Sequence, residues 1–113
     1  MSKEELLRKV KDIKFKRVRS GMIKIALQTG ACDRGNHAVT VNDEAMIFYY
    51  RGVKIAYALF KTLEMHVIYA ENYERTAATS NQRKMIKEAL KEIKNAVGKE
   101  AEVSDNNTRC CKY

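Results

Sequence analysis

The chain has 113 residues, of which 45% are hydrophobic and 32% are charged, and its formal net charge is +8. This length suits one domain with a modest core, and the composition excludes a disordered chain. No apolar run approaches the roughly 18–20 residues that cross a bilayer. The start, Met-Ser-Lys-Glu-Glu, lacks the features of a signal peptide. We therefore expect a small basic domain that works in the cytoplasm and makes no use of a membrane.

The basic charge is concentrated toward the two ends of the chain. Residues 1–30 carry a net charge of +6, residues 31–80 carry −1, and residues 81–113 carry +3. Clustered cations attract polyanions such as nucleic acids. A lysine-rich surface also keeps a small domain soluble, so the charge alone leaves both roles open.

The first predicted element is a helix over residues 3–12. Ser2 and Glu5 match the S-x-x-E capping box, and apolar residues follow at helical spacing. Beyond this helix the apolar residues alternate with polar ones on both sides of a Ser-Gly pair. This alternation favours a β-hairpin over residues 13–28. A helix over residues 17–28 is the competing prediction.

The middle of the chain predicts an antiparallel meander. Residues 29–37 contain two glycines, an aspartate and an asparagine, which is typical of a loop. The residues that follow are rich in strand-forming types and are separated by short turns. The expected strands are residues 39–41, 45–50, 53–59 and 65–70, with turns at Arg51-Gly52 and Lys61–Glu64. Such a sheet is usually covered on one face and solvated on the other.

A C-terminal helix is expected to cover the sheet. Thr79 and Gln82 form a second capping box, and Gly98 lies where a helix-ending glycine belongs. An apolar stripe runs between them at helical spacing. The residues beyond, 99–113, are polar and are expected to form a flexible tail. The predicted fold is a single α+β domain over residues 1–98, with an antiparallel sheet of four to six strands, a short N-terminal helix and the C-terminal helix packed on one face.

The residue pattern does not predict an enzyme, a cofactor or a metal site. His37 lies close to Cys32 in the sequence, but Cys–His catalysis requires hydrogen-bond reach and a third group that orients the base. His66 falls within a predicted strand, where a structural role is the simpler interpretation. A zinc site would have to combine Cys32 and His37 with Cys110 and Cys111, a spacing unlike the usual C-x-x-C pairs. We interpret the three cysteines as reduced thiols.

Two basic segments are the main candidates for a binding surface. The first runs from Lys14 to Arg19, although charges on an edge strand also prevent aggregation. The second is a row of lysines on the C-terminal helix, at positions 84, 87, 91 and 94, whose neighbours Glu88 and Glu92 offer i,i+4 pairing. A row of cations binds phosphates without reading sequence. The residues predicted to bind DNA or RNA are Lys14, Lys16, Arg17, Arg19, Arg75, Arg83, Lys84 and Lys87.

Two further features are compatible with nucleic-acid binding. Aromatic residues gather on or beside the predicted sheet, and exposed aromatics next to cations stack on bases; core packing and cross-strand pairing are the alternative. These residues are Phe48, Tyr49, Tyr50, Tyr57, Phe60, Tyr69 and Tyr73. Thr76, Thr79 and Ser80 precede or open a helix beside Arg75 and Arg83, where free N–H groups favour a phosphate. Capping alone also explains Thr79.

Several short motifs between about residues 13 and 93 carry a resemblance. They are Phe15-Lys16-Arg17-Val18-Arg19-Ser20, Phe48-Tyr49-Tyr50, Gly52, Ile55-Ala56 and Tyr73-x-Arg75-Thr76-x-x-Thr79-Ser80. In these motifs the chain resembles a broad group of small bacteriophage proteins, and it departs from them at Ala77-Ala78. The resemblance implies a phage accessory protein in the bacterial cytoplasm. The group has no agreed biochemical function, so no catalytic residue carries over.

These observations lead to two functional predictions of different classes. The first is a non-enzymatic phage accessory protein that binds nucleic acid through its basic surface. The second is a viral inhibitor that binds a host protein, such as a CRISPR nuclease complex, another defence effector or the transcription machinery. The first requires the basic segments to lie on one continuous surface, whereas the second favours a bare apolar patch.

Overall fold

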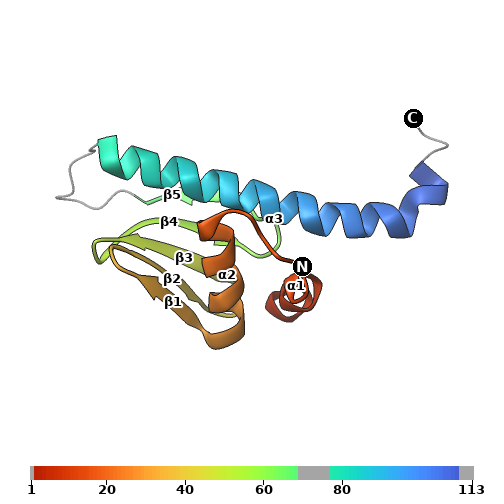
Figure 1. Cartoon of the computed structure of the whole chain (residues 1–113), viewed down its shortest axis with the longest axis horizontal. Helices are drawn as coiled ribbons and strands as arrows, with labels where there is room; N and C mark the ends of the chain where they lie inside the picture. The colour runs from red at the N-terminus through yellow and green to blue at the C-terminus, as the bar shows by residue number, and fades with distance from the viewer. Residues whose placement is uncertain (1, 69–76, 110–113) are drawn as a thin grey trace.

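The computed structural model describes residues 2–68 and 77–109 and has the predicted α+β architecture (Figure 1). Within these residues five strands form one antiparallel sheet of order β1-β2-β3-β4-β5, so strands that are consecutive in sequence pair with each other. The strands are β1 (Ala31–Arg34), β2 (His37–Val41), β3 (Ala45–Tyr50), β4 (Val53–Leu59) and β5 (Met65–Val67). The helices are α1 (Lys3–Val10), α2 (Val18–Thr29) and α3 (Ala77–Arg109).

Tight turns with left-handed backbone join the strands. Arg51 (φ 52°) and Gly52 (φ 79°) connect β3 to β4, as the sequence predicts. Gly35 (φ 63°) lies in the equivalent turn between β1 and β2. The prediction of a loop over residues 29–37 is therefore wrong at β1, which pairs with β2 along its whole length. This edge strand buries one side chain, Cys32, and so carries little of the alternation that identifies strands.

The β-hairpin predicted over residues 13–28 is wrong, and the competing helix is correct. The side chains that α2 buries recur at helical spacing and are Ser20, Met22, Ile23, Ala26 and Leu27. Ile25 is 37% exposed whereas Ala26 is fully buried, which is the reverse of what strand alternation requires. Gly30 ends the helix in the left-handed region (φ 98°), and its N–H donates to the Ala26 carbonyl.

Helices α2 and α3 pack on the same face of the sheet. α2 contacts β1 and β2, while α3 contacts β3, β4 and β5. From the sheet, Val39, Phe48 and Ile55 point into this interface, and each is at most 2% exposed. Ile47 and Tyr57 face the other way, pair across β3 and β4, and are half-buried. One face of the sheet thus carries the core, and neither α2 nor α3 covers the other.

Helix α3 is longer than predicted. It begins before Thr79 and continues through Gly98 to Arg109, so the predicted end at Gly98 is wrong. A glycine inside a helix costs only about 1 kcal/mol relative to alanine, which surrounding helix formers offset. Figure 1 shows the last part of α3 extending past the sheet and α1. The predicted flexibility of residues 99–113 stays a prediction, and residues 110–113 lie outside the described part.

Helix α1 confirms its capping prediction. The Ser2 hydroxyl accepts a hydrogen bond from the Glu5 N–H at 3.2 Å, and the helix ends at Val10, slightly before the predicted end at residue 12. Leu6 is fully buried between α1 and the neighbouring helices α2 and α3. Among the described residues, none of the helices combines the length and hydropathy that a membrane span requires.

Candidate nucleic-acid interface

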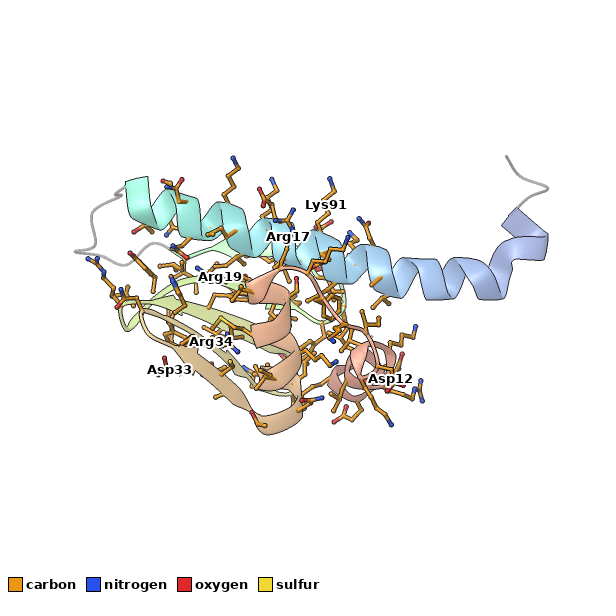
Figure 2. All side chains as sticks on the ribbon, in the orientation of Figure 1. Asp12, Arg17, Arg19, Asp33, Arg34 and Lys91 are labelled. Atoms are coloured by element: carbon orange, nitrogen blue, oxygen red, sulfur yellow. The ribbon has the colours of Figure 1, made fainter. Side chains whose placement is uncertain are left out.

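The connector between α1 and α2, residues 11–17, lies against α3. The main-chain N–H of Lys16 donates to Glu92 Oε2 at 3.3 Å, and Arg17 Nη1 lies 2.8 Å from Glu88 Oε2. Figure 2 shows Arg17 reaching the middle of α3, beside the turn that carries Lys91. The contacting residues are separated by more than 70 positions in the sequence. The fold therefore brings the two basic segments together.

Glu92 joins α3 to the start of α2. The N-cap residue of α2, Arg17, makes no side-chain capping hydrogen bond. The Glu92 carboxylate accepts hydrogen bonds from the N–H of Lys16, the residue before that N-cap, and from the Ser20 hydroxyl in the first turn. A carboxylate at a helix N-terminus also interacts favourably with the helix dipole. The charge of Glu92 is thus used inside the fold, at the start of α2.

Exposed lysines lie on the connector and along α3, where Lys87 and Lys91 also line a hollow beside Leu63, Glu64 and Met65. Five lysine side chains are exposed, and their ammonium groups make no hydrogen bond or ion pair within residues 2–68 and 77–109. We call them the lysine face: Lys14, Lys16, Lys84, Lys87 and Lys91. On α3 this face spans about 10 Å, since a helix rises about 1.5 Å per residue. Lys94, one turn further on, pairs with Glu64 at 3.5 Å and lies beside the face.

Three other residues predicted to bind nucleic acid differ from these lysines. Arg17 is half-exposed and paired with Glu88. Arg83 Nε donates to the Ile55 carbonyl at 3.1 Å, and its Nη2 donates to the Ile68 carbonyl at 2.8 Å. Arg83 therefore joins α3 to β4 and to the residue after β5. Arg75 lies outside the described residues, and binding of nucleic acid by all three stays a prediction.

The structure describes only part of the threonine-rich segment at the start of α3. Thr79 is 1% exposed and lies inside the first turns of α3, because the helix begins at Ala77 rather than at Thr79. Ser80 is exposed, and Thr76 lies outside the described residues. Thr79 is thus buried and Arg83 donates to main-chain carbonyls, and the phosphate site expected at Thr76, Thr79, Ser80, Arg75 and Arg83 stays a prediction.

Arg19 lies apart from the lysine face, between α2, β2 and α3 (Figure 2). Its Nη2 lies 3.2 Å from His37 Nε2 and 3.8 Å from Met85 Sδ, and it also donates to Gln82 Oε1. His37 stacks on Tyr50 with the ring centroids 5.4 Å apart. Burial lowers the pKa of Arg19, and burial followed by the charge of Arg19 lowers the pKa of His37. Because a guanidinium has only donors, Nε2 is the accepting nitrogen of a neutral imidazole.

Two arginines that the sequence analysis did not select lie beside His37. The guanidinium of Arg51 lies over the Tyr50 ring, 5.3 Å from its centroid. Arg34 is the direct cross-strand partner of His37 in the β1–β2 hairpin. We call Arg19, Arg34, His37 and Arg51 the arginine cluster. The Gly-Asn pair between β1 and β2 is a hairpin signal that would have placed Arg34 opposite His37.

The predicted aromatic cluster is divided between the two faces of the sheet. Three of its members are buried in the core: Phe48, Tyr50 and Phe60. Tyr49 and Tyr57 lie on the opposite face, where Tyr57 stacks on His66 with centroids 4.9 Å apart. The expectation that one of the adjacent tyrosines faces away from the core is confirmed. The remaining two members, Tyr69 and Tyr73, lie outside the described residues.

The cysteine and metal hypotheses gain no support from the geometry. Cys32 is a buried free thiol opposite Val39, whereas His37 lies opposite Arg34, and no hydrogen bond joins the two. Within residues 2–68 and 77–109 no group of three or more His, Cys, Asp or Glu side chains is placed to hold a metal ion. Cys110 and Cys111 lie outside these residues.

No family model matches the chain, and neither the curated proteins nor the solved structures include a match. The resemblance to small phage proteins therefore stays a prediction. We base the function on the placement and the charge of the side chains themselves.

Proposed function

We propose that this protein binds the phosphate backbone of a nucleic acid through the lysine face, as a small accessory protein of phage type without catalytic chemistry. The observation that carries the proposal is the contact of residues 16 and 17 with Glu92 and Glu88. This contact joins basic segments from the two ends of the chain. The nucleic-acid hypothesis requires the basic segments to lie on one continuous surface. Basic segments at separate places in the fold would be evidence against it.

The electrostatics of the surface support the same function. Glu88 and Glu92 lie among the lysines, but Glu88 is paired with Arg17, and Glu92 accepts hydrogen bonds from the Lys16 N–H and the Ser20 hydroxyl. Neither carboxylate holds a lysine ammonium group among the described contacts. Exposed lysines exchange their counterions for phosphates with little reorganisation, and they read no bases. The expected binding is thus independent of sequence and steeply dependent on salt.

Fluorescence-anisotropy titrations with labelled double-stranded DNA, single-stranded DNA and RNA at several salt concentrations test the proposal. If all five lysines contact phosphates of duplex DNA, the slope of log K against log salt reaches about −4.5. Affinity would then fall roughly 500-fold between about 50 and 200 mM salt. An absence of binding to all three ligands at low salt contradicts the proposal.

Charge reversal separates the two halves of the face. Lys14→Glu with Lys16→Glu changes the connector, and the Lys16 main-chain contact to Glu92 is kept. Lys84→Glu with Lys87→Glu changes α3. Each pair should reduce the steepness of the salt slope by about two, because two phosphate contacts are lost. An effect of only one pair would show that the two segments do not act as one surface.

The matched control is Lys54→Glu with Lys61→Glu. Both side chains are exposed, Lys54 on β4 and Lys61 in the turn after it, and the pair makes the same change in net charge. It should weaken binding through the long-range field while leaving the salt slope nearly unchanged. If the control lowers the slope as much as the other pairs, the net charge of the protein binds the nucleic acid and the lysine face does not.

The second candidate function is an inhibitor that docks on a host protein. It is favoured by the face of the sheet that neither α2 nor α3 covers, where Ile47, Tyr49 and Tyr57 are half-buried and adjacent. Such a partner would carry an apolar surface of its own. This candidate predicts no nucleic-acid binding at low salt, and it predicts capture of one host protein that Tyr57→Lys abolishes and Lys84→Glu with Lys87→Glu does not.

A further inference from the structure

We propose that the arginine cluster is a binding site for a tetrahedral oxyanion, namely a phosphate group that is either free or at the end of a larger ligand. The cluster lies at the end of the sheet where the β1–β2 and β3–β4 turns meet α2 and α3. It shares no residue with the lysine face. The proposal therefore stands independently of nucleic-acid binding by those lysines.

The first argument is the set of donors that Arg19 keeps. All its hydrogen bonds leave from Nη2, toward His37, Gln82 and Met85. Nε and Nη1, which carry three N–H groups between them, make no hydrogen bond within the described residues. No buried side-chain nitrogen or oxygen of those residues lacks a partner. The three donors therefore reach solvent, and a guanidinium edge of this kind matches a phosphate group in a two-bond geometry.

The second argument is the missing counter-charge. The groups that contact Arg19 are a neutral imidazole, an amide and a thioether. The ion pairs within the described residues involve Arg17 and Lys94, not this arginine. Arg34, the cross-strand partner of His37, and Arg51, over the Tyr50 ring, add two exposed positive charges at the same end of the sheet. A partly buried cation without a contacting carboxylate, such as Arg19, favours the binding of an anion.

The third argument is the size of the space. Arg19, His37, Tyr49 and Gln82, together with six apolar residues, line a cavity of about 10 Å³, which holds about one water molecule. A phosphate group does not fit inside this space. The ligand must therefore bind on the surface of the cluster, against the unused donors of Arg19.

The test follows the titration of His37 by NMR in sodium sulfate and in sodium chloride of equal ionic strength. Sulfate is the probe because it stays a dianion across the titration of histidine. The charged and titratable groups around His37 are Arg19, its cross-strand partner Arg34, the stacked Tyr50 with Arg51 over its ring, and Asp33 and Tyr49, which line a surface hollow with it. A bound dianion among them should raise the His37 titration midpoint by about one unit. His66, on the opposite face, is the internal control, and an equal response of both histidines overturns the proposal.

Two variants locate the site. Arg19→Gln removes the unused donors and should abolish the response of His37 to sulfate. Arg19 also joins α2 to α3, so Arg19→Gln could lose the response by unfolding. A second variant, Arg51→Gln, leaves this contact in place and should raise the sulfate dissociation constant roughly tenfold. Lys54→Gln removes one charge from the opposite face and should leave that constant unchanged. If Arg51→Gln and Lys54→Gln behave alike, the proposal is wrong.

The source of the phosphate is decided by two further ligands. Inorganic phosphate is compared with sodium chloride of equal ionic strength. A 5′-phosphorylated oligonucleotide is compared with the same oligonucleotide without the phosphate. A response to inorganic phosphate alone assigns the site to a free anion, and a response to the 5′-phosphate as well assigns it to a strand end. A failure of both, together with sulfate, overturns the proposal. The sulfate titration contains no nucleic acid, so its outcome and that of the lysine-face experiment are read separately.

Discussion

At the residue scale, Glu92 matters more to the fold than its position among lysines suggests. It accepts hydrogen bonds from the Lys16 N–H and the Ser20 hydroxyl and so joins α3 to the start of α2. We expect Glu92→Ala to cost about 2 kcal/mol of unfolding free energy in urea denaturation, because two charge-assisted hydrogen bonds between distant segments are lost. Glu88→Ala is the matched control and should cost less than about 1 kcal/mol, since its pair with Arg17 is half-exposed. Equal costs would contradict this role of Glu92.

His37 should make stability depend on pH. Its pKa is lowered from the ordinary 6.5 by burial and then by the charge of Arg19. The unfolded chain therefore binds the proton first as the pH falls, and the free energy of unfolding decreases below about pH 6.5. Urea midpoints measured between about pH 7.5 and 5 should fall less steeply for His37→Asn than for the wild type. An equally steep fall for His37→Asn and the wild type would contradict this account.

At the scale of elements, two glycine variants test whether residues 18–29 form the helix α2 or the predicted hairpin. Gly21 lies inside α2, and a Cβ added there meets nothing within 4 Å. Gly21→Ala should therefore stabilise the protein by about 0.5–1 kcal/mol. Gly30→Ala, at the end of the same helix with φ 98°, should cost about 1 kcal/mol. Thermal unfolding of the two variants checks both signs, and a destabilising Gly21→Ala would restore the turn that the hairpin prediction required.

Strands β3 and β4 were predicted from the sequence, whereas β1 was not and α2 was only the competing prediction. Strands β3 and β4 were predictable because both are rich in strand-forming residues and the Arg51-Gly52 turn separates them. The alternation over residues 13–28 was misleading, because lysines and apolar residues can alternate for a few positions on a helix as well. β1 was missed because an edge strand with one buried side chain has almost no pattern.

Some residues of the candidate sites were predictable from the sequence, and others are placed only by the tertiary structure. The lysines at positions 14, 16, 84 and 87 were recognised from local charge, and they are exposed. Their meeting depends on the tertiary contact of the connector with α3, which no local pattern encodes. Arg34 and Arg51 were not selected because only the register of two hairpins and a ring contact place them beside His37. Isolated arginines near turns carry no signal of their own.

At the scale of the whole molecule, the fold brings basic segments from the two ends of the chain into contact. The net charge of +6 in residues 1–30 and of +3 in residues 81–113 is separated by a near-neutral middle in the sequence. The middle forms the sheet, and the connector and α3 meet on the helical side of that sheet. The uncovered face of the sheet is instead aromatic and apolar, with Tyr49, Tyr57 and Ile47 half-buried. Nucleic-acid binding is proposed for the helical side, and docking on a host protein is the alternative proposed for the uncovered face.

Chemical-shift mapping on the ¹⁵N-labelled protein decides between these faces most directly. A short DNA duplex is titrated into the protein at low salt, and amide shifts are followed residue by residue. The account predicts that the largest changes fall in the connector, residues 14–17, and along α3 between residues 84 and 91, and that they vanish at high salt. Changes centred on Ile47, Tyr49 and Tyr57, or no changes at all, would contradict it.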